Sequence, residues 1–200
     1  MKLINKIGRH VKHGAMWYLT SLLLWFAAVS LSPTSASATI SVPIPDHDLI
    51  EQSVAIVVGQ VIALESYSDL EAGMIFTLIT LSVDDILKGN LSVSELTIKQ
   101  PGGKVEDRQA WVFGSPEFTH GEKSLLFLTY NEDGTLRVAH LYQGKFSIML
   151  DAATGKEMVS RDESPAGVFV SGWAGKDKAS LSDITKFREL ESFKAKIRAV

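Results

Sequence analysis

Short apolar segments separated by turn-favouring residues restrict this chain to a small set of folds. Three of them, Lys123–Tyr130, Thr135–Tyr142 and Lys145–Leu150, are separated only by "NEDG" and "QG". β-Branched and aromatic residues favour strands, and pairs such as Asp-Gly favour the tight turns of hairpins. Short strands at this spacing predict an antiparallel barrel or sandwich.

Earlier segments extend the same pattern. The run Val54–Tyr67 predicts a long strand with a bend or a close approach at Gly59. In the segment that starts at Met74, apolar and mixed residues alternate, which indicates a strand of a curved sheet packed on one side. Glu95–Gln100 predicts a third strand, and Lys156–Arg161 predicts a short one near the end of the sheet.

Two helices are predicted to flank the strands. In the segment Pro43–Ser53, Asp46 is expected to cap a short helix. The negative charge of Asp48 would stabilise the same helix by lying near the positive end of its dipole. A second helix, amphipathic, is predicted over residues 181–198, with its stripe packed on the sheet. The alternative is a partner-binding or membrane-surface helix, because its polar face is basic. The stripe consists of Leu181, Ile184, Phe187, Leu190, Phe193 and Ile197.

The first residues have the layout of an export signal. Four basic residues precede the apolar run Ala15–Leu31, and small residues follow at Ala36-Ser37-Ala38. This arrangement predicts a signal peptide over residues 1–38, cleaved after Ala38, and hence a periplasmic or secreted protein. The alternative is an uncleaved membrane anchor through residues 15–31, which would be the protein's only contact with the membrane.

Charge and cysteine content exclude several function classes. Without residues 1–38 the chain has 16 basic and 23 acidic residues, a formal charge of −7. Nucleic-acid binding needs a basic face, so no nucleic-acid partner is predicted. The chain has no cysteine, which excludes thiol nucleophiles, thiolate metal sites and disulfides. The remaining 162 residues are enough to bury a core without disulfides.

The order of the segments resembles two known groups. The blocks "SVAIVVGQV", "TLITLSVDDILKG", "LTIKQPGGKV", "GSPEFTHGEKSLLFL" and "DGTLRVAHLYQGKF" are similar to a family of uncharacterised exported bacterial proteins, over roughly Leu49–Asp151. More distantly, the order resembles the netrin-like domain of tissue inhibitors of metalloproteinases, an OB-type barrel. The matching pieces are Ala55–Val61, Leu87–Gly89, Phe127-Leu128 and Asp133-Gly134. Those inhibitors act through an amino-terminal cysteine that this chain lacks, so the resemblance implies the fold and leaves the inhibitory mechanism unsupported.

The resulting prediction is a mainly β protein, a small closed or partly open antiparallel OB-like barrel with a short N-terminal helix and a C-terminal amphipathic helix. The predicted parts are a signal peptide (1–38), a helical lead-in (39–53), the barrel (54–161), a loop (162–180) and the helix (181–198).

Few residues suggest catalysis. Only His47, His120 and His140 lie beyond the predicted signal. The "DHD" around His47 lacks the spacing of a zinc motif, so a metal site is not predicted, and no cofactor is implied. His140 is expected in mid-strand, at a rim or in the core, and His120 in a polar turn. No nucleophile elbow is present, so a hydrolase built on His120 or His140 is an alternative and enzyme activity is the less favoured prediction.

The stretch "KQPGGKVED", Lys99–Asp107, could suggest a phosphate loop. A P-loop needs its two glycines spaced and a Ser or Thr after the lysine, whereas Val105 follows Lys104. A turn fits better, with Pro101 at its second position and Gly102 at the third, where φ is positive.

The long segment after the third strand is the predicted binding region, since barrels of this type bind with a sheet face and its loops. Its aromatic residues form a contact surface if exposed, and we expect them to be buried, capping the barrel. The function predicted is an exported, non-enzymatic binding module with a partner in the cell envelope or among secreted proteins; the alternatives are a regulator or inhibitor of an exported protease and the hydrolase. The predicted ligand contacts are Gly102, Gly103, Lys104, Trp111, Phe113, Phe118 and His120.

Overall fold

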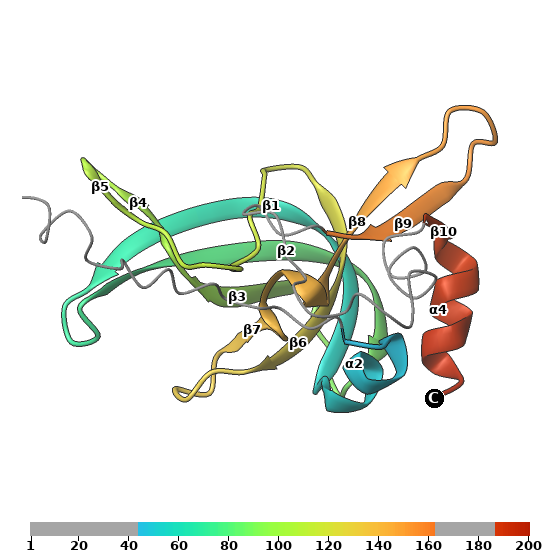
Figure 1. The fold of residues 1–200 in the computed structure, drawn as a ribbon, viewed down its shortest axis with the longest axis horizontal. Coiled ribbons are helices and arrows are strands. Elements are labelled where there is room, and N and C mark those ends of the chain that lie inside the picture. Colours follow the sequence, from blue (N-terminus) through green and yellow to red (C-terminus); the bar gives the residue numbers. More distant parts are fainter. Residues whose placement is uncertain (1–43, 163–186) are drawn as a thin grey trace, which may run out of the picture. The chain divides into compact units, whose positions relative to one another are not determined.

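The computed structural model describes residues 44–162 and 187–200 (Figure 1). The predicted signal peptide, most of the predicted loop 162–180 and the start of the predicted C-terminal helix lie outside these residues. None of the helices in 44–162 and 187–200 is long and apolar enough to cross a membrane.

The protein is mainly β, as predicted, with one antiparallel sheet of eight strands and two α-helices in the described part (Figure 1). The strand order is β10-β9-β8-β6-β1-β2-β3, and β7 also pairs with β6. A separate hairpin is formed by β4 and β5. The elements are α2 (Asp46–Gln52), β1 (Ala55–Asp69), β2 (Met74–Lys88), β3 (Glu95–Pro101), β4 (Gly103–Val105), β5 (Arg108–Ala110), β6 (Lys123–Tyr130), β7 (Leu136–Val138), the 3₁₀ turn η1 (Leu141–Gly144), β8 (Lys145–Leu150), β9 (Glu157–Arg161), β10 (Arg188–Glu189) and α4 (Leu190–Arg198).

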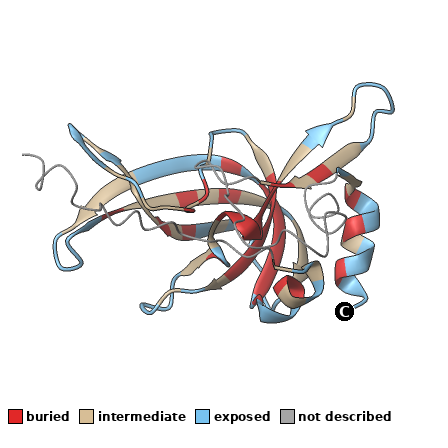
Figure 2. Ribbon diagram, viewed as in Figure 1, coloured by how far each residue is buried: buried red, intermediate tan, exposed pale blue. Residues whose placement is uncertain are grey.

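The first half of β1 is apolar on both faces because it separates two cores. Ile56 and Val58 pack into one core, and Ala55, Val57 and Val61 into the other. The first core is covered by α2 and α4, and it contains Phe127, Phe146 and Phe193 in mutual contact. The second core lies between β1, β2, β3 and β6. Figure 2 shows that burial is concentrated where β1, β6 and β8 meet, whereas the far half of the β1–β2 hairpin is exposed or half-buried.

Gly59 allows β1 to approach β2 closely, as predicted. A Cβ atom at this position would lie 2.6 Å from the carbonyl oxygen of Ser82 on the neighbouring strand. The β1–β2 ladder shifts register on either side of the same region, between Val58 and Gly59 and between Val61 and Ala63. Such irregularities bend a strand and increase its twist, and so curve the sheet around the second core.

Closure of a barrel is not confirmed. Strands β3 and β7 run beside each other, and the Asn131 side chain donates a hydrogen bond to the Lys99 carbonyl at 3.2 Å. Within residues 44–162 and 187–200, however, no backbone ladder joins the two strands. The sheet is therefore open at this point.

The prediction of a C-terminal helix is wrong over residues 187–189 and confirmed from Leu190 on; residues 181–186 lie outside the described part of the chain. The helix begins at Leu190, and Arg188 and Glu189 form a short strand that pairs with β9. The stripe is confirmed at Leu190, Phe193 and Ile197, which are buried, whereas Phe187 is 52% exposed. Pairing with β9 holds this segment extended, which overrides the helical period of its sequence.

Two other local predictions are corrected. The strand expected over Thr135–Tyr142 ends at Val138, because His140 and Leu141 take positive φ values of 52° and 59° and lead into η1. His140 is consequently an exposed residue before η1 and does not lie in mid-strand. Asp46 does not cap α2; its carboxylate binds Arg161, Arg188 and Lys196.

Candidate functional site

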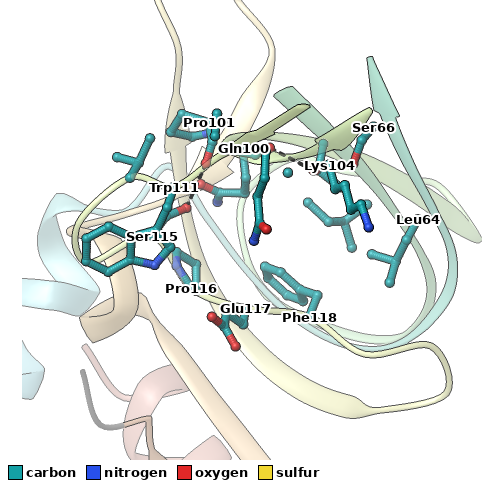
Figure 3. A pocket seen from close by; sticks show the side chains of 17 residues that line it. Leu64, Ser66, Gln100, Pro101, Lys104, Trp111, Ser115, Pro116, Glu117 and Phe118 are labelled. Atoms are coloured by element: carbon teal, nitrogen blue, oxygen red, sulfur yellow. Dashed lines mark hydrogen bonds between the residues drawn. The ribbon is translucent and has the colours of Figure 1, made fainter. Parts of the chain in front are cut away.

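A cavity lies between the first three strands, the β4–β5 hairpin and the loop that follows it, and we call it the hairpin cavity (Figure 3). Its volume is about 360 Å³, within the range usual for small-molecule sites. Its lining consists of Leu64, Ser66, Thr77, Ile79, Gln100, Pro101, Gly102, Gly103, Lys104, Gln109, Ala110, Trp111, Val112, Ser115, Pro116, Glu117 and Phe118.

The two glycines of "KQPGGKVED" shape the edge of the cavity. Gly102 (φ 103°) and Gly103 (φ 133°) take conformations that residues with a side chain rarely adopt, which confirms positive φ at Gly102 and identifies the stretch as a turn between strands. The Gly102 amide donates to the Ile75 carbonyl at 2.8 Å, and the Thr77 hydroxyl donates to the Gly102 carbonyl at 2.8 Å. A Cβ atom at Gly103 would lie 2.6 Å from the Ser66 hydroxyl, so glycine is required here.

The loop 111–118 is tied to the sheet at two points, one in its middle and one at its end. The Ser115 hydroxyl donates to the Pro101 carbonyl at 3.0 Å. At the end of the loop, the ammonium of Lys145 lies 4.8 Å from the centre of the Phe118 ring and donates to the Glu117 carbonyl. These contacts hold Phe118 against the second core, where it forms part of the cavity wall.

Lys145 is a buried cation that the sequence analysis did not identify. Its side chain is 5% exposed and lies 2.8 Å from the Glu122 carboxylate and 3.0 Å from that of Asp162. A charge buried to this degree is stable only when it is paired, and here two carboxylates from different elements provide the pairing. The position follows Gly144 directly in an apolar segment, and nothing in the sequence pattern marks it as buried.

Five of the seven predicted contact residues line the hairpin cavity: Gly102, Gly103, Lys104, Trp111 and Phe118. Trp111 lines the cavity but is 57% exposed, so the predicted burial of its ring is wrong. Trp111 directly follows β5, outside both cores, and its ring meets that of Phe113 edge-on with 5.8 Å between ring centres. Phe113 and His120 lie outside the lining, Phe113 half-buried and His120 exposed.

The sequence analysis also missed Gln100, which is 4% exposed and lines the cavity. Its Nε2 atom has no hydrogen-bond partner among the residues that the structure describes. As the sixth residue of β3, it alternates with Lys99 and Pro101, and a polar residue on the buried face of a strand could have been recognised from that alternation.

Within the described residues, His47, His120 and His140 are not assembled with the partners that a catalytic site needs. His47 lies 3.4 Å from the exposed carboxylate of Glu51. His140 is exposed as a residue, but the surrounding protein partly desolvates its imidazole, and this desolvation together with the charges of Arg137 and Arg161 lowers the pKa of His140, which favours the neutral imidazole. Within the described ranges no carboxylate pairs with His120 or His140, and no group of three metal-ligating side chains occurs.

Comparison of the chain with protein-family models, with curated proteins and with solved structures found no match in any of the three. The resemblances expected from the sequence therefore stay predictions.

Proposed function

We propose that this protein is an exported, non-enzymatic binding module that takes a small ligand into the hairpin cavity. The observation that carries the proposal is that residues singled out from the sequence for contact, which lie on a turn, a hairpin and a loop, line one cavity of small-molecule size. Its walls are largely apolar, with a few polar groups directed inward, which is the usual composition of such sites.

The finer fold that we propose is an OB-type barrel of β1, β2, β3, β6 and β7. Support comes from the strand order, in which β1 pairs with β2 and β6, β2 with β3, and β6 with β7. Only the step from β3 to β7 lacks a ladder, and the Asn131–Lys99 hydrogen bond spans it. OB-type barrels use the face of their second and third strands for binding, and the hairpin cavity is lined in part by Thr77 and Ile79 of β2 and by Gln100 of β3.

Binding is preferred to hydrolysis because of what surrounds the histidines. A hydrolytic site needs a base within hydrogen-bond reach of a nucleophile and an orienting group behind the base. His120 and His140 have no such partners within residues 44–162 and 187–200. Regulation of an exported protease stays a prediction.

Native mass spectrometry of the protein purified from cells tests the proposal. Small molecules extracted from the culture would be offered to three forms: the wild type, Leu64→Trp and Ile62→Trp. Leu64 lines the cavity and is 40% exposed, so a tryptophan there fills the space. Ile62 lies on the same strand, is 38% exposed and does not line it, which makes it a matched control.

The expected result is a retained small molecule in the wild type and in Ile62→Trp, and none in Leu64→Trp. If the wild type retains no small molecule, or if Leu64→Trp retains it equally well, the proposed function is overturned. Sequencing the amino terminus of the same preparation tests export, with a mature chain that starts at Thr39 as the expected outcome.

A further inference from the structure

Lys145 is a buried lysine held between two carboxylates. Its side chain is 5% exposed, and its Nζ atom lies 2.8 Å from Glu122 Oε1 and 3.0 Å from Asp162 Oδ2. Nζ also donates to the carbonyl of Glu117, so each hydrogen of the ammonium has an acceptor. The centre of the Phe118 ring lies 4.8 Å from Nζ and helps to exclude water. An amine and two carboxyl groups are therefore packed together away from solvent.

The sheet fixes the positions of these three groups. Lys145 begins β8, which pairs with β6 on one side and with β9 on the other (Figure 1). Asp162 directly follows β9, and its amide donates to the Lys145 carbonyl at 3.0 Å. Glu122 directly precedes β6. Well-oriented groups of this kind can react as if one were present at about 10⁵ to 10⁸ M around the other.

The two oxygens of Asp162 have different surroundings. Oδ2 faces the Lys145 ammonium, whereas Oδ1 accepts hydrogen bonds from the Ser147 amide at 3.1 Å and from the Ser147 hydroxyl at 2.6 Å. Two donors on one oxygen stabilise the negative charge that collects there when the carboxyl carbon is attacked, as an oxyanion hole does. The Asp162 carboxyl is therefore arranged to react with an amine at its Oδ2 side.

Glu122 is placed to carry protons between the two groups. Its Oε2 atom accepts a hydrogen bond from the Thr119 amide at 3.0 Å, and this bond leaves Oε1 directed at Lys145 Nζ. Moving one proton from an ammonium to a carboxylate converts both into neutral groups, and burial favours neutral forms over charged ones. A neutral amine beside a protonated carboxyl group is the state from which an amide can form.

We infer that Lys145 and Asp162 join in an isopeptide bond after the chain has folded. The Nζ atom attacks the Cγ atom of Asp162, which forms the C–N bond and places the negative charge on Oδ1. The bond from Cγ to Oδ2 then breaks, and Oδ2 leaves as water with two protons that came from the ammonium. Glu122 transfers these protons and ends as the carboxylate that it was at the start.

The reaction balances without any further reactant. An ammonium and a carboxylate give an amide and one water molecule, nothing is oxidised or reduced, and the net charge does not change. A cavity of about 250 Å³ lined by Glu122, Lys145 and Asp162 gives the released water a place to go.

The bond would fasten the end of β9 to β8. Strand β9 pairs with β10, which leads into α4, so the cross-link would hold the C-terminal elements on the sheet. The chain has no cysteine, so no disulfide can do this. The inference does not involve the hairpin cavity and stands or falls independently of the proposed function.

Lys123 provides an internal comparison. It also lies between two carboxylates, 2.8 Å from Glu157 and 3.4 Å from Asp84, but its side chain is 32% exposed. Water keeps such groups charged, so no bond is expected at Lys123.

Mass spectrometry of the purified, denatured protein tests the inference. We expect a mass that is lower by one water molecule than the mass calculated from the sequenced amino terminus. Because other dehydrations remove the same mass, the protein would also be digested with trypsin, which cleaves after free lysines. The expected digest contains Lys145 joined to Asp162 and no cleavage after Lys145, whereas the chain is cleaved after Lys123.

Two variants assign the roles. Lys145→Arg keeps the positive charge and should retain the full mass. Glu122→Gln should fold, because the Glu122 side chain is 24% exposed, and should form the bond about 100-fold or more slowly, the usual effect of removing a proton-transfer group. Lys123→Arg and Glu157→Gln are the matched controls and should lose water as the wild type does. Circular dichroism would establish that each variant is folded.

A wild type with its full mass overturns the inference, and this result does not depend on any variant. Water loss that persists in Lys145→Arg, or a digest in which Lys145 is joined to Glu122, overturns the assignment to Asp162. Equal rates of bond formation in Glu122→Gln and the wild type would refute proton transfer by Glu122.

Discussion

Asp46 joins both helices to the sheet through three cations, and replacing it is the sharpest test of how the fold is held together. The carboxylate lies 3.0 Å from Arg161, 3.1 Å from Lys196 and in contact with Arg188. The Arg161 side chain is 2% exposed, and Asp46 is its only carboxylate partner in the described part of the chain. Asp46→Asn removes the charge and keeps the shape.

The magnitude follows from these exposures. Removing one partner of a buried ion pair costs about 3 to 5 kcal/mol, because the other charge is left unpaired. The lower end applies, since an asparagine oxygen can still accept one hydrogen bond and Lys196 is 55% exposed, where an ion pair contributes about 1 kcal/mol at most. We expect a loss of about 3 kcal/mol from a free energy of unfolding of about 5 to 15 kcal/mol.

Urea unfolding followed by circular dichroism at neutral pH measures this loss. With a slope of about 1 to 3 kcal/mol per molar urea, the midpoint should fall by about 1 to 3 M. Asp48→Asn is the control, because Asp48 lies in the same first turn of α2 and would share any effect of the helix dipole, about 0.3 to 1 kcal/mol. Equal losses in the two variants would refute the role of the ion cluster and point to the helix dipole instead.

Acid should abolish the difference between the wild type and Asp46→Asn. Burial raises the pKa of Asp46, but the charges and hydrogen bonds of Arg188 and Lys196 outweigh it, so the pKa lies below its ordinary value. A carboxyl with a pKa lowered by folding stabilises the protein above its unfolded pKa of about 3.9, and this contribution is lost as pH falls through the folded pKa. If the difference in free energy of unfolding between the wild type and Asp46→Asn stays constant below pH 4, the charge of Asp46 is not its cause.

Three further tests of the packing use the same unfolding measurement, two of them with a control variant. Phe193→Ala should lower the free energy of unfolding by about 3 to 5 kcal/mol, because the ring is buried between two other rings. Phe187→Ala, at an exposed residue before α4, should change it by less than about 0.5 kcal/mol. Similar losses in the two variants would contradict the observed start of α4. Gly103→Ala should cost clearly more than Gly121→Ala, because both have positive φ and only Gly103 has neighbours within 4 Å; equal costs would exclude the close approach to Ser66. Lys145→Met should cost about 3 kcal/mol by leaving two carboxylates unpaired, and a neutral or stabilising result would show that its pairing is not needed.

Most strands could be predicted because their signals are local. The bounds of β6 and β8 match the predicted segments, since turn residues on each side end the strand without help from distant parts of the chain. The same applies to the turn at Gly102, where only glycine tolerates the required φ.

The errors fall where distant segments meet. Arg188 lies in the segment predicted to be helical from its apolar spacing. It pairs instead with Val159 on β9 and binds Asp46, and these contacts favour the extended conformation over the helix. His140 follows apparent strand residues, but the chain turns there so that the Tyr142 amide can donate to the Gly114 carbonyl. Neither partner is close in sequence, so no local pattern could show the competition.

The sequence by itself determined the β-rich class, the positions of most turns and the glycine edge of the hairpin cavity, because these depend on the conformational preferences of neighbouring residues. Only the tertiary structure decided which of those residues share a cavity. The pairing of β1, β2 and β3 brings Leu64, Thr77 and Gln100 together from three separate segments. It also buries Gln100 without a partner, and burial is a property of the assembled sheet that depends on the residues packed around it.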